Sequence, residues 1–372
     1  MLECQDPGGP GYSDVMDGTS SGRGATSPGR IRSVGEFKVQ LQDVFDNNEE
    51  SIQRFGETRR VQLKTYLVES TLPPGKIPAL LEDWSPLDSR GWYVTSPAGE
   101  NGFFVLDATG SRVWRVFSLF GASQSDAAIE KWVGLNRGLD YCWLQRGQLT
   151  MWGKREGWRE RGVGIRFDDG LAPLETQGYF SLKAWHGAGR RLPGLDNLVE
   201  EARGSFAIYS VRWEKVSPAG GAELIECYSD GKITVNRADN VDEVLHFSSE
   251  LAEHYQSSLL GAERQRDKRL VPFELDFSQK IDLNAFSETV RVGKGPMSLW
   301  LSETSHEEDF RQFRGVDLHT GDKILVDMGY DYAYLSVPSP GCVNAAPRLA
   351  VVQGEDNAGR TAIVQDGVEV FG

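Results

Sequence analysis

The stretch ELIECYSDGKITVNRADNVDEVLHFSSELAEHYQSSLL, residues 223–260, decides the fold class. Two runs rich in Ile, Val, Thr and Tyr flank the turn Ser229-Asp230-Gly231, as in a β-hairpin with a tight connection. After Asn240, apolar residues recur at helical spacing, and Glu243 stands where a capping box needs a carboxylate. An antiparallel hairpin followed by an amphipathic helix is typical of an α+β protein.

The region before this stretch repeats the same combination of strands and helix. Runs at 92–94, 103–106 and 113–119 have strand character and are separated by turn-forming residues, which predicts a β-meander. Ser125 and the following Asp then predict a helix that Gly138 ends. A helix over 195–202 is expected further along the chain.

The region after this stretch reads as mainly β-structure. We expect a short helix around Phe310 and Phe313 among its strands. The expected strands are 273–277, 298–301, 323–328, 332–337 and 361–365.

The N-terminal 35 residues differ in composition from the rest of the chain. They contain eight Gly, five Ser and three Pro, too little apolar surface to offset the entropy of ordering. The sequence therefore predicts an α+β fold of two or three modules, each a mainly antiparallel sheet covered by one or two helices, behind a disordered tail. The predicted divisions are 1–35 for the tail, then 36–172, 173–269 and 270–372 for the modules.

The overall charge and the cysteine content limit the classes of function. With 40 Lys plus Arg against 54 Asp plus Glu, the net charge is -14, which disfavours a broad nucleic-acid footprint. Four cysteines without a CxxC spacing encode neither a disulfide framework nor a zinc ribbon. No apolar run has the length of a membrane span, and the first residues do not form a signal peptide. A cytoplasmic protein without membrane contact is expected.

Three groups of residues have the chemistry of functional sites. His246, Glu250 and His254 are spaced by four, so that three metal-ligand types share one helix face. A helical wheel places this face opposite the apolar face of the same helix. The simpler interpretation is therefore a solvated face without metal.

The second group is the basic segment from Arg146 to Arg166, which has a local charge balance of +4. Aromatic residues lie between its cations, as a surface that binds phosphate and stacks bases requires. The alternative is a hairpin that pairs with acidic parts of the protein and packs its tryptophans in the core. The candidate nucleic-acid-binding residues are Lys154, Arg155, Trp158, Arg159 and Arg161.

The third group is Asp317, His319 and Cys342. On a strand, Asp317 and His319 would share a face, and Cys342 follows a Pro-Gly turn, so a cysteine nucleophile with a base is one hypothesis. A lone cysteine is more often a small buried apolar residue.

No complete catalytic constellation is present, and the sequence favours a non-enzyme over an enzyme. The leading hypothesis is a binding or scaffolding component of a cytoplasmic complex, with a protein partner and no cofactor. The alternatives are nucleic-acid or phosphate recognition through the basic segment, and a cysteine-dependent hydrolase or transferase.

Overall fold

The computed structural model describes most of the chain. The described residues are 31–55, 62–73, 75–80, 84–96, 103–155, 157–168, 179–185, 207–216, 220–269, 271–293, 296–356 and 359–371.

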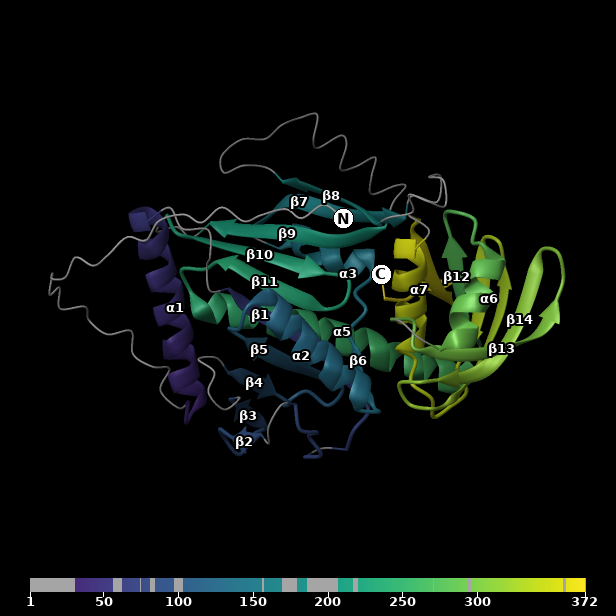
Figure 1. Cartoon of the computed structure of the whole chain (residues 1–372), viewed down its shortest axis with the longest axis horizontal. Helices are drawn as coiled ribbons and strands as arrows, with labels where there is room; N and C mark the ends of the chain where they lie inside the picture. The colour runs from purple at the N-terminus through teal and green to yellow at the C-terminus, as the bar shows by residue number, and fades with distance from the viewer. Residues whose placement is uncertain are drawn as a thin grey trace, which may run out of the picture.

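Within these residues, eleven strands form one antiparallel sheet in the order β2-β3-β4-β5-β1-β11-β10-β9-β7-β8, with β6 also paired to β1 (Figure 1). Their bounds are β1 Leu63–Ser70, β2 Ser85–Pro86, β3 Trp92–Thr95, β4 Phe104–Asp107, β5 Val113–Ser118, β6 Leu139–Tyr141, β7 Trp158–Asp168, β8 Tyr179–Trp185, β9 Ile208–Val216, β10 Ala222–Tyr228 and β11 Lys232–Arg237.

Local sequence explains the two hairpin regions of this sheet. Strands β3, β4 and β5 pair in succession as the expected meander, and β10 pairs with β11 across the turn at Gly231. Gly231 has φ +77°, and a Cβ there would lie 2.7 Å from the carbonyl oxygen of Cys142. Only glycine fits this left-handed turn, where the hairpin crosses the chain that follows β6.

Helices cover both faces of the large sheet. On one face, α1 (Val34–Phe55) and α5 (Val241–Arg269) share a core with Leu67 and Phe117. On the other face, α2 (Ala122–Leu135) packs on the neighbouring residues Val68 and Val116. Strand residues alternate between faces, so β1 contributes to both cores and is buried along its whole length.

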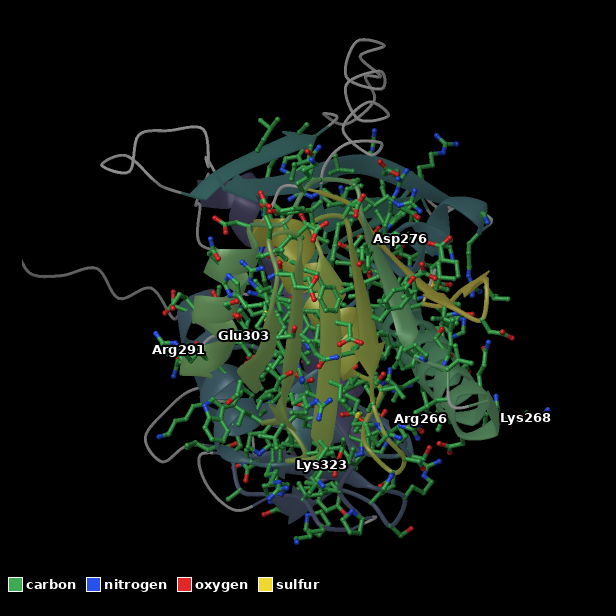
Figure 2. The ribbon with its side chains drawn as sticks, turned by 90° about the vertical axis from the view of Figure 1, so that its right-hand side faces the viewer. Arg266, Lys268, Asp276, Arg291, Glu303 and Lys323 are labelled. Carbon is green, nitrogen blue, oxygen red and sulfur yellow. The ribbon has the colours of Figure 1, made fainter. Side chains whose placement is uncertain are left out.

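The C-terminal part of the chain forms a second antiparallel sheet, which Figure 2 turns toward the viewer. In the described residues its seven strands run in the order β13-β14-β15-β16-β12-β17-β18. Their bounds are β12 Phe273–Phe277, β13 Leu299–His306, β14 Phe310–Asp317, β15 Lys323–Gly329, β16 Tyr332–Ser336, β17 Thr361–Gln365 and β18 Val368–Glu369. Helix α6 (Leu283–Val292) packs beside β13; Asp282 caps its start and Gly293, in the left-handed region, ends it.

Helix α7 (Ala345–Asp356) lies between the two sheets and contacts strands of both (Figure 1). Residues 345–354 are all buried, including Leu349 and Ala350, as expected for a helix enclosed on every side. Two shorter helical elements, α3 (Arg146–Thr150) and η1 (Met151–Lys154), connect β6 to β7.

The α+β fold class predicted from the sequence is confirmed, but three details need correction. The segment around Phe310 and Phe313 is not a helix but strand β14, where Phe313 is buried and its neighbours face outward. Helix α7 was not expected at all. Helix α1 begins at Val34, and Ile31 before it is buried, so ordered packing starts ahead of the predicted boundary at residue 35.

Two other expectations concern residues outside the described ranges. These are the helix over 195–202 and, of the predicted tail over 1–35, residues 1–30. Strands from the predicted segments 36–172 and 173–269 share one sheet, through the pairing of β1 with β11, whereas 270–372 holds the other sheet. The number of independent folding units stays a prediction.

Among the helices that the structure describes, none combines the length and apolarity needed to cross a bilayer.

A buried arginine connects the two sheets through α7. The guanidinium group of Arg348 contacts Asp140 in β6 and lies 2.5 Å from the carboxylate of Asp317 at the end of β14. The Arg348 side chain is completely buried, and the two carboxylates are nearly so. Each sheet therefore supplies one negative charge to a single enclosed cation.

We expect Arg348→Met to lower the free energy of unfolding by about 3–5 kcal/mol, because it leaves two buried carboxylates without their counter-charge. Urea denaturation monitored by circular dichroism measures the change. The control is Arg291→Met, which removes an exposed ion pair with Glu288 and should cost under about 0.5 kcal/mol. Equal effects of the two substitutions would contradict the assigned role of Arg348.

Candidate functional site

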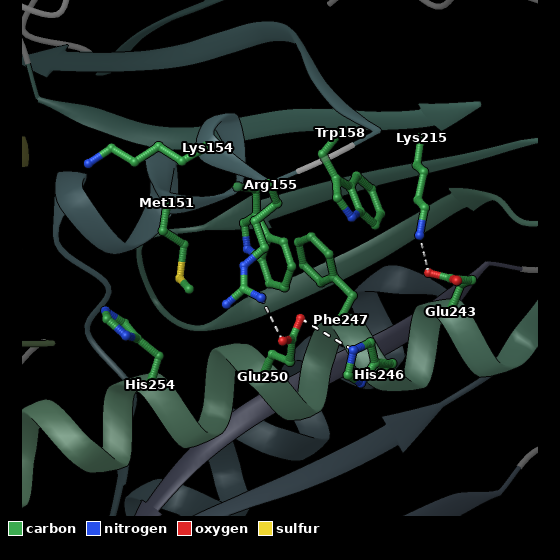
Figure 3. A pocket seen from close by; sticks show the side chains of 11 residues that line it. Met151, Lys154, Arg155, Trp158, Lys215, Glu243, His246, Phe247, Glu250 and His254 are labelled. Carbon is green, nitrogen blue, oxygen red and sulfur yellow. Dashed lines mark hydrogen bonds and ion pairs between the residues drawn. The ribbon is translucent and has the colours of Figure 1, made fainter. Parts of the chain in front are cut away.

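Two of the groups found in the sequence meet at one pocket. A pocket of about 610 Å³ opens between η1 and β7 on one side and α5 on the other (Figure 3). Its polar lining includes Lys154, Arg155, Lys215, His246, Glu250 and His254. The basic segment and the helix face with two histidines, which lie about ninety residues apart in the chain, therefore face each other.

The inner wall of the pocket is aromatic. The rings of Trp152 and Phe247 stack with their centroids 3.9 Å apart, and Trp158 packs against Phe247 at 4.9 Å. All three side chains are buried, so they belong to the core as much as to the pocket. The tryptophans of the basic segment, Trp152 and Trp158, are therefore packed in the core, as the alternative interpretation of that segment expects.

The charged groups at the mouth are held in ion pairs. The guanidinium group of Arg155 lies 4.9 Å from the Trp152 ring centroid and 2.7 Å from the Glu250 carboxylate. On the other side, Lys215 pairs with Glu243 at 2.6 Å. The Arg155 guanidinium therefore has a cation–π contact with a buried ring and an ion pair across the pocket.

The histidines have different surroundings. His246 is exposed and lies 3.5 Å from Glu250, as an i, i+4 pair. Partial burial, and to a lesser degree the charge of Arg155, lowers the pKa of His254. Within the described residues, His246, Glu250 and His254 do not bring three ligand atoms close enough together to share a metal ion.

The other residues of the predicted basic surface do not join the pocket. Arg161 pairs with Glu214 at 2.5 Å. Arg159 is exposed and follows the buried Trp158 on β7, so it lies on the opposite face of the strand. Of the five candidates, Lys154, Arg155 and Trp158 line the pocket, while Arg159 and Arg161 do not.

A second site, enclosed between the two sheets, contains part of the third group. Glu69 of β1, His319 of the β14–β15 turn and Cys342 before α7 place one ligand atom each within 4.8 Å of one another. His319 Nε2 lies 3.2 Å from one oxygen of Glu69, and the Cys342 thiol donates to the other at 3.6 Å. All three side chains are buried.

Arg112, directly before β5, contacts this cluster from one side. Its guanidinium lies 2.5 Å from Glu69, 2.7 Å from Glu263 of α5 and 3.4 Å from the Cys342 sulfur. Burial raises the pKa of the Glu69 carboxyl, against the opposing charges of His319 and Arg112. Burial likewise raises the pKa of the Cys342 thiol well above its ordinary value.

The structure brings Cys342 and His319 together, as the third hypothesis requires, but not Asp317 with the ring of His319. Asp317 accepts a hydrogen bond from the backbone N–H of His319 and binds Arg348. His319 lies past the end of β14, so the expected strand alternation does not apply to it. The group that contacts the ring is Glu69.

Sequence reasoning missed Glu69 and Arg112. Glu69 lies within the strand LKTYLVES at 63–70, and Arg112 lies directly before the strand VWRVFS at 113–118. Charged residues within or beside apolar strands are rarely buried without a partner, and this is the signal in the sequence that could have found them.

The fold and these sites define a class, that of α+β proteins with two antiparallel sheets, a cationic surface pocket and a polar cluster between the sheets. The chain belongs to the MJECL33-like protein family, whose sequence pattern matches residues 28–352. It is similar to a Methanocaldococcus jannaschii protein described as uncharacterized protein MJECL33, with 23% identity over 337 residues. That similarity covers 77% of this chain and 82% of the relative.

We expect iodoacetamide to label Cys342 in the native protein at neutral pH no faster than Cys142 or Cys227, because all three thiols are free, buried and raised in pKa. Peptide mass spectrometry after timed labelling measures the three rates, and labelling in denaturant is the control. Selective rapid alkylation of Cys342 would instead support a cysteine nucleophile.

Proposed function

We propose that this protein is a non-enzymatic binding component that recognises a phosphate-bearing ligand in the pocket between η1, β7 and α5. The observation that carries the proposal is the set of cations there: Lys154, Arg155 and Lys215, with two histidines, against two glutamates. In a chain with a net charge of -14, such a local excess attracts anions to one place.

The geometry of Arg155 supports recognition of a planar or tetrahedral oxyanion. Its guanidinium contacts the Trp152 ring and pairs with Glu250, and both contacts restrict the side chain before a ligand binds. Lys154, exposed at the end of η1, adds a flexible ammonium group from the same side. The forked guanidinium of Arg155 together with the ammonium group of Lys154 suits a phosphate group.

The surroundings of the other candidate groups support binding rather than catalysis. A hydrolase or transferase centred on Cys342 needs a nucleophile that its substrate can reach, and both Cys342 and His319 are buried. Among the described residues that line it, the pocket has two histidines and no cysteine, and its carboxylates are held in ion pairs with Arg155 and Lys215.

Glu250 limits the affinity of the pocket in its resting state. A ligand phosphate must compete with this carboxylate for Arg155, because the two side chains already form an ion pair. Replacing Glu250 with Gln removes one negative charge and frees the guanidinium.

We expect Lys154→Ala or Arg155→Ala to weaken binding of inorganic pyrophosphate about tenfold, because each removes a charge-assisted contact. Glu250→Gln should strengthen it several-fold. Isothermal titration calorimetry measures the dissociation constants, and tryptophan fluorescence gives a second readout from Trp152 and Trp158 in the pocket wall.

Arg159→Ala is the matched control, since Arg159 belongs to the same basic segment but lies outside the pocket. Its dissociation constant should stay within about twofold of the wild type. A labelled single-stranded oligonucleotide distinguishes nucleic acid from a small ligand, because its affinity would rise with length and fall steeply with salt. No pyrophosphate binding, or an equal loss with Arg159→Ala, would contradict the pocket proposal.

We expect sulfate binding to strengthen as the pH falls, because an anion favours protonated His254. Because the pKa of His254 is lowered, the increase in sulfate affinity appears only below about pH 6.5, the ordinary pKa of histidine. Arg155 and Glu250 are the charged neighbours in the pocket, and sulfate keeps a constant charge over this range. Titrations between about pH 7.5 and pH 5.5 test this, and a gain undiminished in His254→Gln would contradict it.

We further propose, as the sequence predicts, that this component works in the cytoplasm with a protein partner. Its described cysteines, Cys142, Cys227 and Cys342, are free thiols, which fits a reducing compartment. Trp300 on the edge strand β13 is 54% exposed and offers a large aromatic contact surface.

A further inference from the structure

We propose that Glu69, His319 and Cys342 bind one divalent transition-metal ion, of which Zn²⁺ fits best, and that this ion joins the two sheets. The proposal is independent of the surface pocket. It concerns the enclosed cluster, whose members come from β1, the β14–β15 turn and the segment before α7.

The spacing of His319 Nε2 and Glu69 Oε2 fits a shared ion, and Cys342 Sγ lies near enough to complete the group with a small side-chain shift. Donors on neighbouring corners of a zinc tetrahedron lie roughly 3–4 Å apart, given zinc bonds of about 2.0–2.3 Å. The Nε2 atom of His319 lies 3.2 Å from Oε2 of Glu69, and Sγ of Cys342 lies 3.6 Å from Oε1. All three donor atoms fall within 4.8 Å of one another.

Unpartnered atoms inside the cluster point to a missing ligand partner. Oε2 of Glu69 and both ring nitrogens of His319 are buried without a hydrogen-bond partner in the described part of the chain. The contact between Oε2 and Nε2 is close but lacks hydrogen-bond geometry. Buried polar atoms normally have partners, and an ion facing Oε2, Nε2 and Sγ would supply one to each ligand.

The charge around the cluster favours a dication. In the described part of the chain, the four carboxylates of Glu69, Glu263, Asp140 and Asp317 contact two guanidinium groups, those of Arg112 and Arg348. With His319 and Cys342 neutral, this network carries two negative charges in a largely buried region. A divalent ion offsets these two charges, and with Cys342 as a thiolate the network and the ion together keep one negative charge.

The donor set selects the class of metal. One thiolate sulfur, one imidazole nitrogen and one carboxylate oxygen suit zinc and similar transition metals, whereas Ca²⁺ and Mg²⁺ prefer all-oxygen sites. Arg112 donates to Glu69 Oε1 and to the Cys342 sulfur, and so orients both ligands. Among the described His, Cys, Asp and Glu side chains these three form the ligand group, so the fourth tetrahedral position is left to another donor. The burial of the three ligands and their origin in both sheets support a role in joining the sheets.

The test is the metal content of the full-length protein, purified from cells grown with added zinc and dialysed, measured by plasma mass spectrometry. We expect about one zinc ion per chain in the wild type, and a loss of most of it in Cys342→Ser and His319→Gln. Cys227→Ser is the matched control, because it also removes a buried free thiol but lies outside the cluster. It should retain the ion.

A measurement on the unaltered protein covers the case in which the variants fail to fold. Cobalt exchanged into the wild type should show the intense visible bands of tetrahedral coordination together with a thiolate-to-cobalt charge-transfer band. Chelation should lower the thermal midpoint, and zinc should restore it.

Folded wild-type protein without stoichiometric metal after zinc supply would overturn the proposal. Cobalt spectra without a thiolate band, or metal retained in folded Cys342→Ser, would overturn it as well, since both place the ion elsewhere.

Discussion

The double ion pair of Arg348 is the interaction on which the arrangement of the two sheets depends. A completely buried guanidinium group is costly to desolvate, and it is tolerated here because one carboxylate comes from each sheet. The amide of Asn344 also donates to Asp140, and Tyr255 of α5 bonds to Asn344, so the beginning of α7 is held through the same network. A shift of either sheet would expose an uncompensated charge, which gives this contact a specificity that apolar packing alone lacks.

The parts of the fold that local chemistry determines could be predicted from the sequence. The turn at Gly231, the meander of β3 to β5 and the long helix after Asn240 each follow from residues within a few positions of one another. Helix α7 could not be predicted in this way, because it contains Pro347 and Gly354 and has a buried arginine between alanines and valines. Its stability comes from packing between two sheets that are distant in sequence. The segment at Phe310 and Phe313 was misread because two aromatic residues three apart fit a helix as readily as a strand with a break.

The candidate sites show the same division between local and distant information. The sequence indicated the two halves of the pocket separately and did not indicate that they meet. The sequence also indicated Cys342 and His319, but it predicted that Asp317 orients the histidine. In the structure the carboxylate beside the His319 ring is that of Glu69, some 250 residues earlier in the chain. Pairing across such a distance is fixed only by the packing of the sheets. The expectation that the protein has no cofactor rested on the lack of a local ligand motif, and a cluster assembled from three distant segments leaves no such motif.

Helix α5 has a mechanical consequence for this protein. This continuous helix of 29 residues carries Glu250 at the pocket. It also carries Glu263, which forms an ion pair with Arg112 beside the enclosed cluster. The two carboxylates are 13 positions apart, about 20 Å along the axis at the usual rise of a helix. Because both carboxylates belong to one continuous helix, its backbone hydrogen bonds fix the spacing between the surface pocket and the seam between the sheets.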